Sequence, residues 1–145
     1  MITHLAISGG GSSGIKFIGS LKYLEETNQL QNIKCILGTS IGAIIAVLLS
    51  YLTIDNIVDN IRNIHGIDRN DINLKLFINN LGLFSKHKIL EDISNILYKT
   101  FFKIPTLLDL YEYSNKEVII ATYSINSDRL VYLNYKLYPN MSIIT

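Results

Sequence analysis

Residues 36–49 read ILGTSIGAIIAVLL, an apolar strand that ends in a G-x-S-x-G motif and continues directly into an apolar helix. The motif glycines, Gly38 and Gly42, allow the backbone to turn tightly enough to present one hydroxyl clear of the sheet. The following helix directs free N–H groups and the positive end of its dipole toward any charge that develops there. The pattern predicts Ser40 as a nucleophile, and the alternative role for a serine at this place is helix N-capping.

A second glycine-rich turn, GGGSSG at residues 9–14, follows a short apolar strand expected within residues 3–8. It leads into a segment with apolar residues at helical spacing, which are Ile15, Ile18, Leu21 and Leu24. Because the carboxyl ends of parallel strands meet at one edge of a sheet, we expect the glycine turn to lie beside Ser40. Its backbone N–H groups can stabilise an oxyanion without a side chain in the way.

The G-x-G-x-x-G spacing of residues 9–14 also fits a dinucleotide-binding turn. That site requires an acidic residue at the end of the second strand, where this chain has only Gly, Thr and Ser at residues 38–40. A phosphate-binding P-loop requires Gly-Lys-Ser/Thr, but Ile15 separates Gly14 from Lys16. We therefore expect no nucleotide or other cofactor.

Three further segments have the periodicity of amphipathic or capped helices. Apolar residues recur at helical spacing within residues 54–64 and again within residues 89–97. Residues 106–113 are expected to form a short helix capped by Thr106, with Asp109 in its first turn. Before them, the first part of the chain reads strand, helix, strand, helix, an alternation that indicates a parallel sheet covered by helices.

The period changes in the last part of the chain. Residues 117–123 and 129–135 are rich in β-branched and aromatic residues, and the turn-forming residues 124–128 join them, so a hairpin is expected. Together with the first two strands, this order predicts an α/β fold with a mainly parallel sheet flanked by helices on both faces.

The composition predicts one folded domain of 145 residues, since 48% of the residues are hydrophobic. The 13 basic residues are scattered among 12 acidic ones, which argues against a nucleic-acid partner. The single cysteine, Cys35, excludes an internal disulfide framework and a clustered cysteine metal site. We expect Cys35 to be a buried core thiol and expect no metal site.

No basic segment followed by a long apolar run opens the sequence, so no signal peptide is expected and the predicted location is intracellular and cytoplasmic. Residues 36–54 contain no charge and could suggest a membrane span. The glycines and hydroxyl residues within residues 38–42 interrupt that stretch, so the remainder is expected to be a buried core helix.

The two motifs together resemble the patatin-like phospholipase family, whose members pair a G-G-G-x-K/R-G loop with a G-x-S-x-G serine. The resemblance extends over essentially the whole chain and includes residues 82–84, 108–111 and 118–132. It implies a three-layer α/β fold and hydrolysis of acyl-ester lipids by a Ser-Asp dyad. Phospholipids or other acyl-ester lipids are then the expected substrates, with peripheral contact with a membrane.

Carried over by position, the resemblance implies Ser40 as the nucleophile and the backbone N–H groups of Gly10, Gly11 and Ser12 as the oxyanion hole. The glycines that define the two motifs are Gly9, Gly11 and Gly14 in the loop and Gly38 and Gly42 around the serine.

Two departures from the family pattern concern charged residues. The Asp-Gly-Gly/Ala motif that carries the family's aspartate is not found in residues 1–145, so we expect these residues to be a patatin-like phospholipase domain that is incomplete at its C-terminal end. Ser13 stands where the family has Lys or Arg, and Lys16 is close in sequence without having to point the same way.

Other bases for the serine find less support in the sequence. A triad in Ser-Asp-His order could combine Asp55 or Asp59 with His65 or His87, but amphipathic helices already account for these polar residues. Asp128 fits turn chemistry. If the chain has no base, the alternative function is a catalytically inactive lipid-binding or interaction module.

Overall fold

The computed structural model describes residues 1–61, 64 and 86–144. The expectations that involve His65 and the family resemblance at residues 82–84 lie outside these residues.

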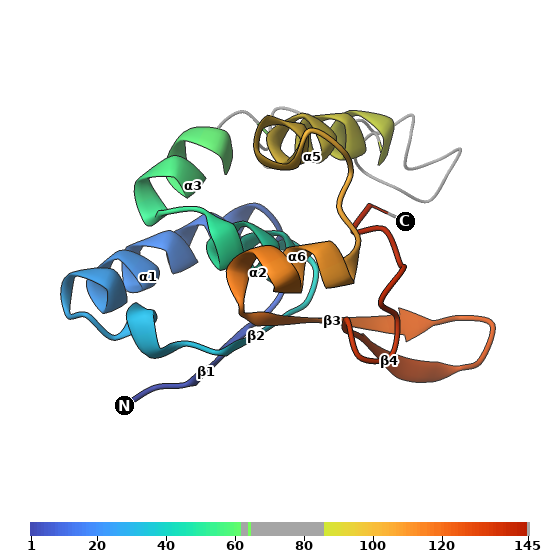
Figure 1. The fold of residues 1–145 in the computed structure, drawn as a ribbon, viewed down its shortest axis with the longest axis horizontal. Coiled ribbons are helices and arrows are strands. Elements are labelled where there is room, and N and C mark those ends of the chain that lie inside the picture. The colour runs from blue at the N-terminus through green and yellow to red at the C-terminus, as the bar shows by residue number, and fades with distance from the viewer. Residues whose placement is uncertain (62–63, 65–85, 145) are drawn as a thin grey trace.

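One four-stranded sheet forms the base of the molecule, with the strand order β1-β2-β3-β4 (Figure 1). The first three strands are parallel, and β4 is antiparallel to β3, with which it forms the expected hairpin. The strand bounds are β1 His4–Ile7, β2 Cys35–Gly38, β3 Glu117–Ser124 and β4 Arg129–Leu133.

Within residues 1–61, 64 and 86–144, five α-helices and two 3₁₀ segments connect these strands. The bounds are η1 Gly11–Lys16, α1 Phe17–Glu26, η2 Leu30–Asn32, α2 Ile41–Tyr51, α3 Ile54–Ile61, α5 Lys86–Phe101 and α6 Leu107–Ser114. The expected α/β class with a mainly parallel sheet is therefore confirmed.

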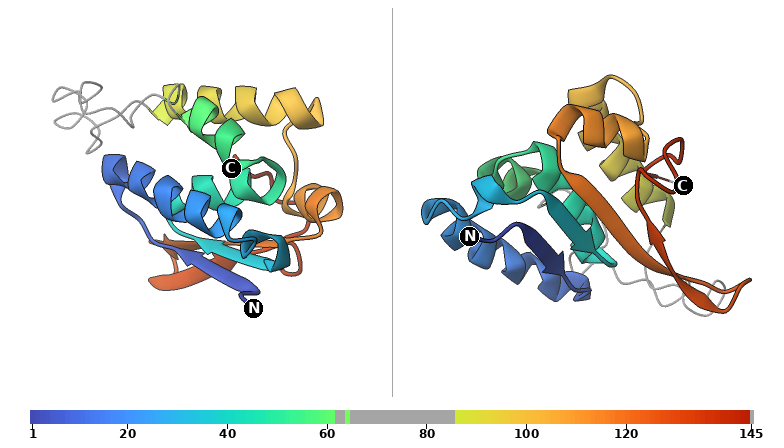
Figure 2. Two further views of the ribbon diagram at one scale, coloured as in Figure 1. Left: turned by 90° about the vertical axis from the view of Figure 1, so that its left-hand side faces the viewer. Right: turned by 60° about the horizontal axis from the view of Figure 1, so that its bottom comes forward.

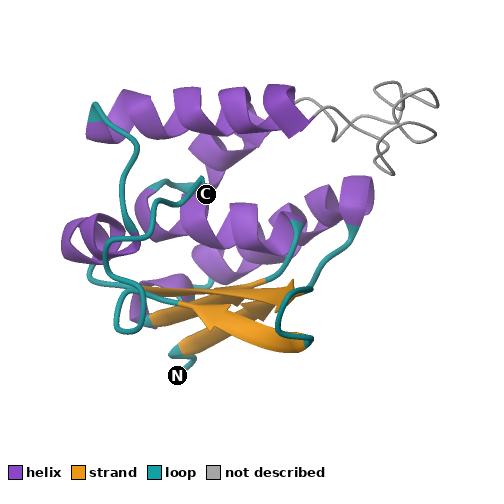
Figure 3. Cartoon of the chain, turned by 90° about the vertical axis from the view of Figure 1, so that its right-hand side faces the viewer, coloured by secondary structure: helices purple, strands orange, loops and turns teal. Residues whose placement is uncertain are grey.

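The described helices lie over one face of the sheet (Figures 1 and 3). The chain steps from β1 to β2 to β3 in one direction, and right-handed crossovers that step the same way place their helices on the same face. Strand alternation agrees, because Ile36 and Val118 are buried beneath the helices whereas His4 and Ala6, which point the other way, are exposed. A helical layer on the opposite face stays a prediction.

Helix α2 is at the centre of the core and packs against β1, β2 and β3. Ile45 and Ala46 at its middle are completely buried, and the apolar faces of α3 and α5 cover its other side. Within the described ranges, no helix combines the length and apolar character needed to cross a bilayer.

Helix α6 begins with the capping arrangement expected from its sequence. The Thr106 hydroxyl accepts a hydrogen bond from the Asp109 N–H at 3.1 Å, and the Asp109 carboxylate accepts one from the Thr106 N–H at 2.8 Å. The Lys103 ammonium donates to the same carboxylate at 2.8 Å. This bond, with that from the Thr106 backbone, lowers the pKa of Asp109.

One expectation about burial is wrong. Cys35 is only half-buried, because strand alternation places it on the face opposite Ile36, away from α2. That partial burial raises the pKa of the Cys35 thiol, and the nearby Glu117 carboxylate adds to the effect.

Candidate active site

Ser40 lies at the turn between β2 and α2 with φ 53° and ψ −129°. A non-glycine residue in such a conformation costs on the order of 1–3 kcal/mol, and the surrounding structure must compensate for this strain. The residue is exposed and occupies the N-cap position, but its side chain makes no capping hydrogen bond. Helix capping therefore does not account for this serine, whose hydroxyl is left available for other chemistry.

The two glycines of the serine motif are required by close backbone approaches. A Cβ at Gly38 would lie 2.2 Å from the Gly42 carbonyl oxygen, and a Cβ at Gly42 would lie 2.3 Å from the Ile7 carbonyl oxygen. Both contacts are with backbone, which cannot move aside as a flexible side chain can. The turn at Ser40 is thus held between the end of β2, the start of α2 and the end of β1.

The glycine loop of residues 9–14 meets the serine turn at the same edge of the sheet. A Cβ at Gly9 would lie 3.3 Å from the Ser40 Cβ, and the Thr39 N–H donates to the Ile7 carbonyl at 3.3 Å. Gly14 is buried against the first residue of α2, so closely that a Cβ there would lie 2.4 Å from Ile41 Cγ2. The structure therefore brings together the two motifs that the sequence singled out.

The loop passes directly into the start of η1, with Gly10 as its N-cap and Gly11 at φ +51°. The first N–H groups of a helical segment have no acceptor within the segment, so those of Gly11 and Ser12 are not used by η1. The Ser13 N–H instead closes the first turn onto the Gly10 carbonyl at 3.0 Å. Ser13 and Lys16 are both exposed on this segment.

A small apolar pocket of about 150 Å³ begins on the first turn of α2, next to Ser40. Its lining comes from α2, α5, β3 and the end of the chain, and the residues are Ala43, Ile44, Val47, Leu48, Ile93, Ile120 and Ile143. None of the described residues that line it is polar, so the pocket suits part of a hydrocarbon chain. Sequence reasoning missed it, because nothing distinguishes an isoleucine that lines a pocket from one that fills the core.

The acidic residues considered as partners for Ser40 have other contacts where the structure describes them. Asp55 pairs with Lys22 at 2.9 Å. Asp128, at φ 49° in the hairpin turn, accepts a hydrogen bond from the Tyr123 hydroxyl. Nor does the described part of the chain contain a cluster of three or more His, Cys, Asp or Glu side chains that could hold a metal ion.

Comparisons with known proteins agree with the motifs. A family model described as patatin-like phospholipase matches residues 5–145. The uncharacterized protein R571 of Acanthamoeba polyphaga mimivirus is 31% identical over 137 residues, a match that covers 88% of this chain and 44% of that protein. The chain therefore spans less than half the length of this curated relative.

Two bacterial proteins of known structure share the fold. ExoU of Pseudomonas aeruginosa, solved in complex with SpcU, superposes with a TM-score of 0.67 at 19% identity, covering 99% of this chain and 36% of that chain. VipD of Legionella pneumophila gives a TM-score of 0.61 at 16% identity, covering 98% of this chain and 40% of that chain. At these identities the likeness shows the arrangement of the chain alone.

Proposed function

The chain belongs to the patatin-like phospholipase family, and from that premise we propose that it carries the nucleophile and the oxyanion-binding loop of a serine hydrolase acting on acyl-ester lipids. The observation that carries the proposal is the approach of the glycine loop to the strained serine, with Gly9 against Ser40. An unstrained serine, or a loop at the other edge of the sheet, would not fit this chemistry.

In the proposed reaction the Ser40 oxygen attacks the ester carbonyl carbon while its proton passes to a base. The tetrahedral intermediate collapses, the carbon–oxygen bond to the alcohol breaks, and the alcohol leaves with the proton. Water then attacks the acyl-serine in the same way, which releases the carboxylic acid and restores the hydroxyl. Each half-reaction places a negative charge on the former carbonyl oxygen.

The backbone N–H groups of Gly10, Gly11 and Ser12 are proposed to bind that oxygen. They suit the role because they lie at the start of η1, where N–H groups have no helical acceptor, and because the glycines leave room for the substrate. One donor of this kind is typically worth about 10²–10³ in kcat.

The apolar pocket beside Ser40 supports an acyl substrate. At about 150 Å³ it is smaller than a typical ligand pocket of roughly 300–1,000 Å³, so we propose that it holds only the part of the acyl chain nearest the ester. Ala43 and Ile44 on the first turn of α2 would contact that part.

Contact with a membrane, peripheral and from inside a cell, is also part of the proposal. β3 continues past its pairing of Ile120 with Gly38, so the β3–β4 hairpin projects on the Ser40 side of the sheet (Figure 2). Ile125 at its turn is 88% exposed, and Leu130 on β4 is 62% exposed. Exposed apolar side chains at the same edge of the sheet as Ser40 suit a substrate that is part of a lipid aggregate.

The proposal assigns the base to a part of the protein beyond these residues. Residues 1–145 lack the Asp-Gly motif of the family and span 44% of the curated relative. We propose that they form part of a larger patatin-like domain whose remainder supplies the aspartate. The 145-residue chain alone should then hydrolyse esters poorly.

A fluorophosphonate probe tests the nucleophile, because it forms a covalent bond with an activated serine without needing the later steps. Mass spectrometry of the longest available form of the protein should find the label on Ser40 and none on the Ser40→Ala variant. Ser13→Ala, which removes a nearby exposed serine, should label like the unmodified protein. Labelling at another residue would refute the assignment of Ser40 as the nucleophile, and absence of labelling would favour the inactive lipid-binding module. In a separate assay, robust ester turnover by the 145-residue chain would require a base within that chain.

A further inference from the structure

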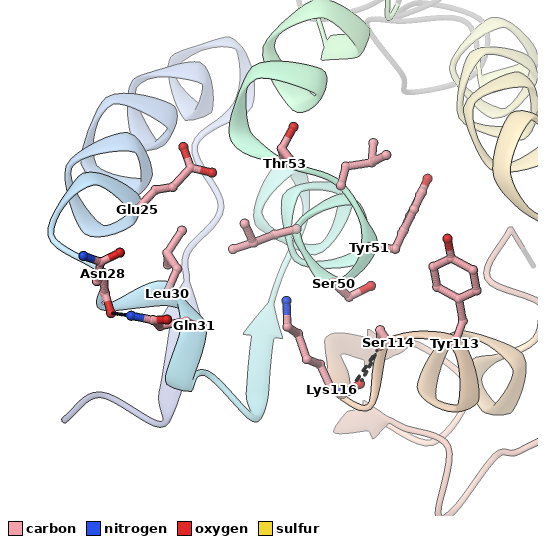
Figure 4. A pocket seen from close by; sticks show the side chains of 12 residues that line it. Glu25, Asn28, Leu30, Gln31, Ser50, Tyr51, Thr53, Tyr113, Ser114 and Lys116 are labelled. Carbon is pink, nitrogen blue, oxygen red and sulfur yellow. Dashed lines mark hydrogen bonds between the residues drawn. The ribbon is translucent and has the colours of Figure 1, made fainter.

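A pocket of about 470 Å³ opens at the opposite edge of the sheet from Ser40 (Figure 4). Lys116, one of its lining residues, directly precedes β3, whereas Ser40 follows the end of the parallel strand β2. The last turns of α1, α2 and α6 contribute other walls, through Glu25, Ser50 and Ser114. The pocket is therefore separate from the candidate active site, and its size is within the range for a small organic ligand.

The backbone around Lys116 is fixed on both sides. Its N–H donates to the Ser114 hydroxyl at 3.1 Å, and the next N–H, that of Glu117, donates to the Lys34 carbonyl at 2.8 Å. The side chain is half-buried and extends into the pocket (Figure 4). The backbone therefore fixes the point from which the Lys116 side chain enters the pocket.

The Lys116 ammonium lacks a carboxylate partner among the described residues. Lys22, Lys103 and Lys136 each pair with a carboxylate at between 2.7 and 2.9 Å, but no such contact exists for Lys116. Burial without a partner lowers the pKa of Lys116. An unpaired, partly desolvated cation is unfavourable, and a bound anion would remove that cost.

Glu25, the one carboxylate among the described residues that line the pocket, does not form an ion pair with Lys116. Glu25 Oε2 accepts a hydrogen bond from the Lys22 ammonium at 2.9 Å, and Oε1 accepts one from the Ile54 N–H at 3.4 Å. The exposed Asp55 carboxylate shares the Lys22 ammonium at 2.9 Å and does not line the pocket, and neither carboxylate forms an ion pair with Lys116.

The walls restrict the kind of anion. The C-terminal ends of three helices face the pocket, and their partial negative charge disfavours a dianion such as phosphate. Leu30, Leu49 and Leu52 give it an apolar wall on which a hydrocarbon or aromatic body can lie. A single negative charge on an apolar body fits both observations.

We propose that this pocket binds a small organic monocarboxylate, with the carboxylate paired to the Lys116 ammonium and the apolar body against the three leucines. The site is independent of the proposed hydrolysis and would exist in a chain with no catalytic base.

Sodium benzoate and benzamide make a matched pair of probes, since they share a shape and differ in charge. In ¹H–¹⁵N spectra of the chain, benzoate should shift the amide resonances of Ser114 and Lys116 and raise the pKa of the Lys116 ammonium, followed at its ¹³Cε. Benzamide at the same concentration should do neither. Equal effects of the two probes, or shifts confined to the surroundings of Ser40, would overturn the proposal.

Variants separate the ion pair from a structural role. Lys116→Met should weaken benzoate binding by about tenfold or more, and Lys116→Arg should keep most of it. Lys34→Met is the matched control, because Lys34 is exposed at the same edge and does not line the pocket. Undiminished benzoate binding by Lys116→Met would overturn the proposal and leave Lys116 with a role only in stabilising the helix ends. If that variant fails to fold, the comparison of benzoate with benzamide on the unmodified chain tests the proposal.

Discussion

Replacing Ser40 by glycine and by alanine measures the strain stored at the serine turn. At φ 53° and ψ −129° a Cβ costs about 1–3 kcal/mol, and glycine avoids that cost. Glycine also has more conformational entropy to lose on folding, which amounts to about 0.5–1 kcal/mol relative to alanine. The difference predicts that Ser40→Gly is more stable than Ser40→Ala by about 1 kcal/mol, the reverse of the usual order.

Urea unfolding followed by far-UV circular dichroism gives both free energies of unfolding, and equal slopes would show that the unfolded states are comparable. Ser13 provides the control, because it is exposed on η1 and is not among the residues with positive φ. There glycine should be less stable than alanine by about 0.5–1 kcal/mol. The same order at Ser40 as at Ser13 would refute the argument that the turn is strained.

Three other predictions test individual contacts. Tyr51→Phe should leave the unfolding free energy unchanged or raise it by about 1–3 kcal/mol, because the Tyr51 hydroxyl is buried with no hydrogen-bond partner among the described residues. A marked loss of stability would contradict this and indicate that the hydroxyl has a hydrogen-bond partner. Asp109→Asn should lower the unfolding free energy by about 0.5–1 kcal/mol at neutral pH. The folded-state pKa of Asp109 lies below its ordinary value of 3.8, so this stabilisation is present above pH 3.8 and is lost as the pH falls through the folded-state pKa. The unfolding free energies of the two proteins should therefore converge in acid. A difference that stays constant with pH would contradict the assignment. Ala43→Leu should fill the pocket beside Ser40 and slow labelling by a long-chain fluorophosphonate while leaving a short-chain probe unaffected; equal slowing of both would indicate damage to the turn itself.

Local chemistry made parts of the fold predictable. The capping box at Thr106 and Asp109 and the turn at Asp128 depend on residues within a few positions of one another. Side-chain periodicity also predicted the apolar face of α3, where Ile54 and Ile57 are buried as expected.

One feature depends on information that no local pattern contains. The half-burial of Cys35 depends on which face of the sheet the helices cover. That choice follows from the direction of the crossovers and not from the residues of the strand.

The candidate site also has one part that the sequence predicts and one part that it does not. The meeting of Gly9 with Ser40 could be expected, because parallel neighbouring strands bring their following turns to one edge. The apolar pocket could not, since Ile93, Ile120 and Ile143 come from distant segments and have no chemical signature.

The close approach of Gly42 to the Ile7 carbonyl makes the strained geometry of Ser40 a property of the assembled sheet. A peptide with the motif alone would have nothing to hold its serine in the strained geometry. Because β1 and β2 are joined by a long crossover, their pairing closes slowly compared with the winding of α2. The strained turn at Ser40 is therefore completed only after β1 and β2 have paired.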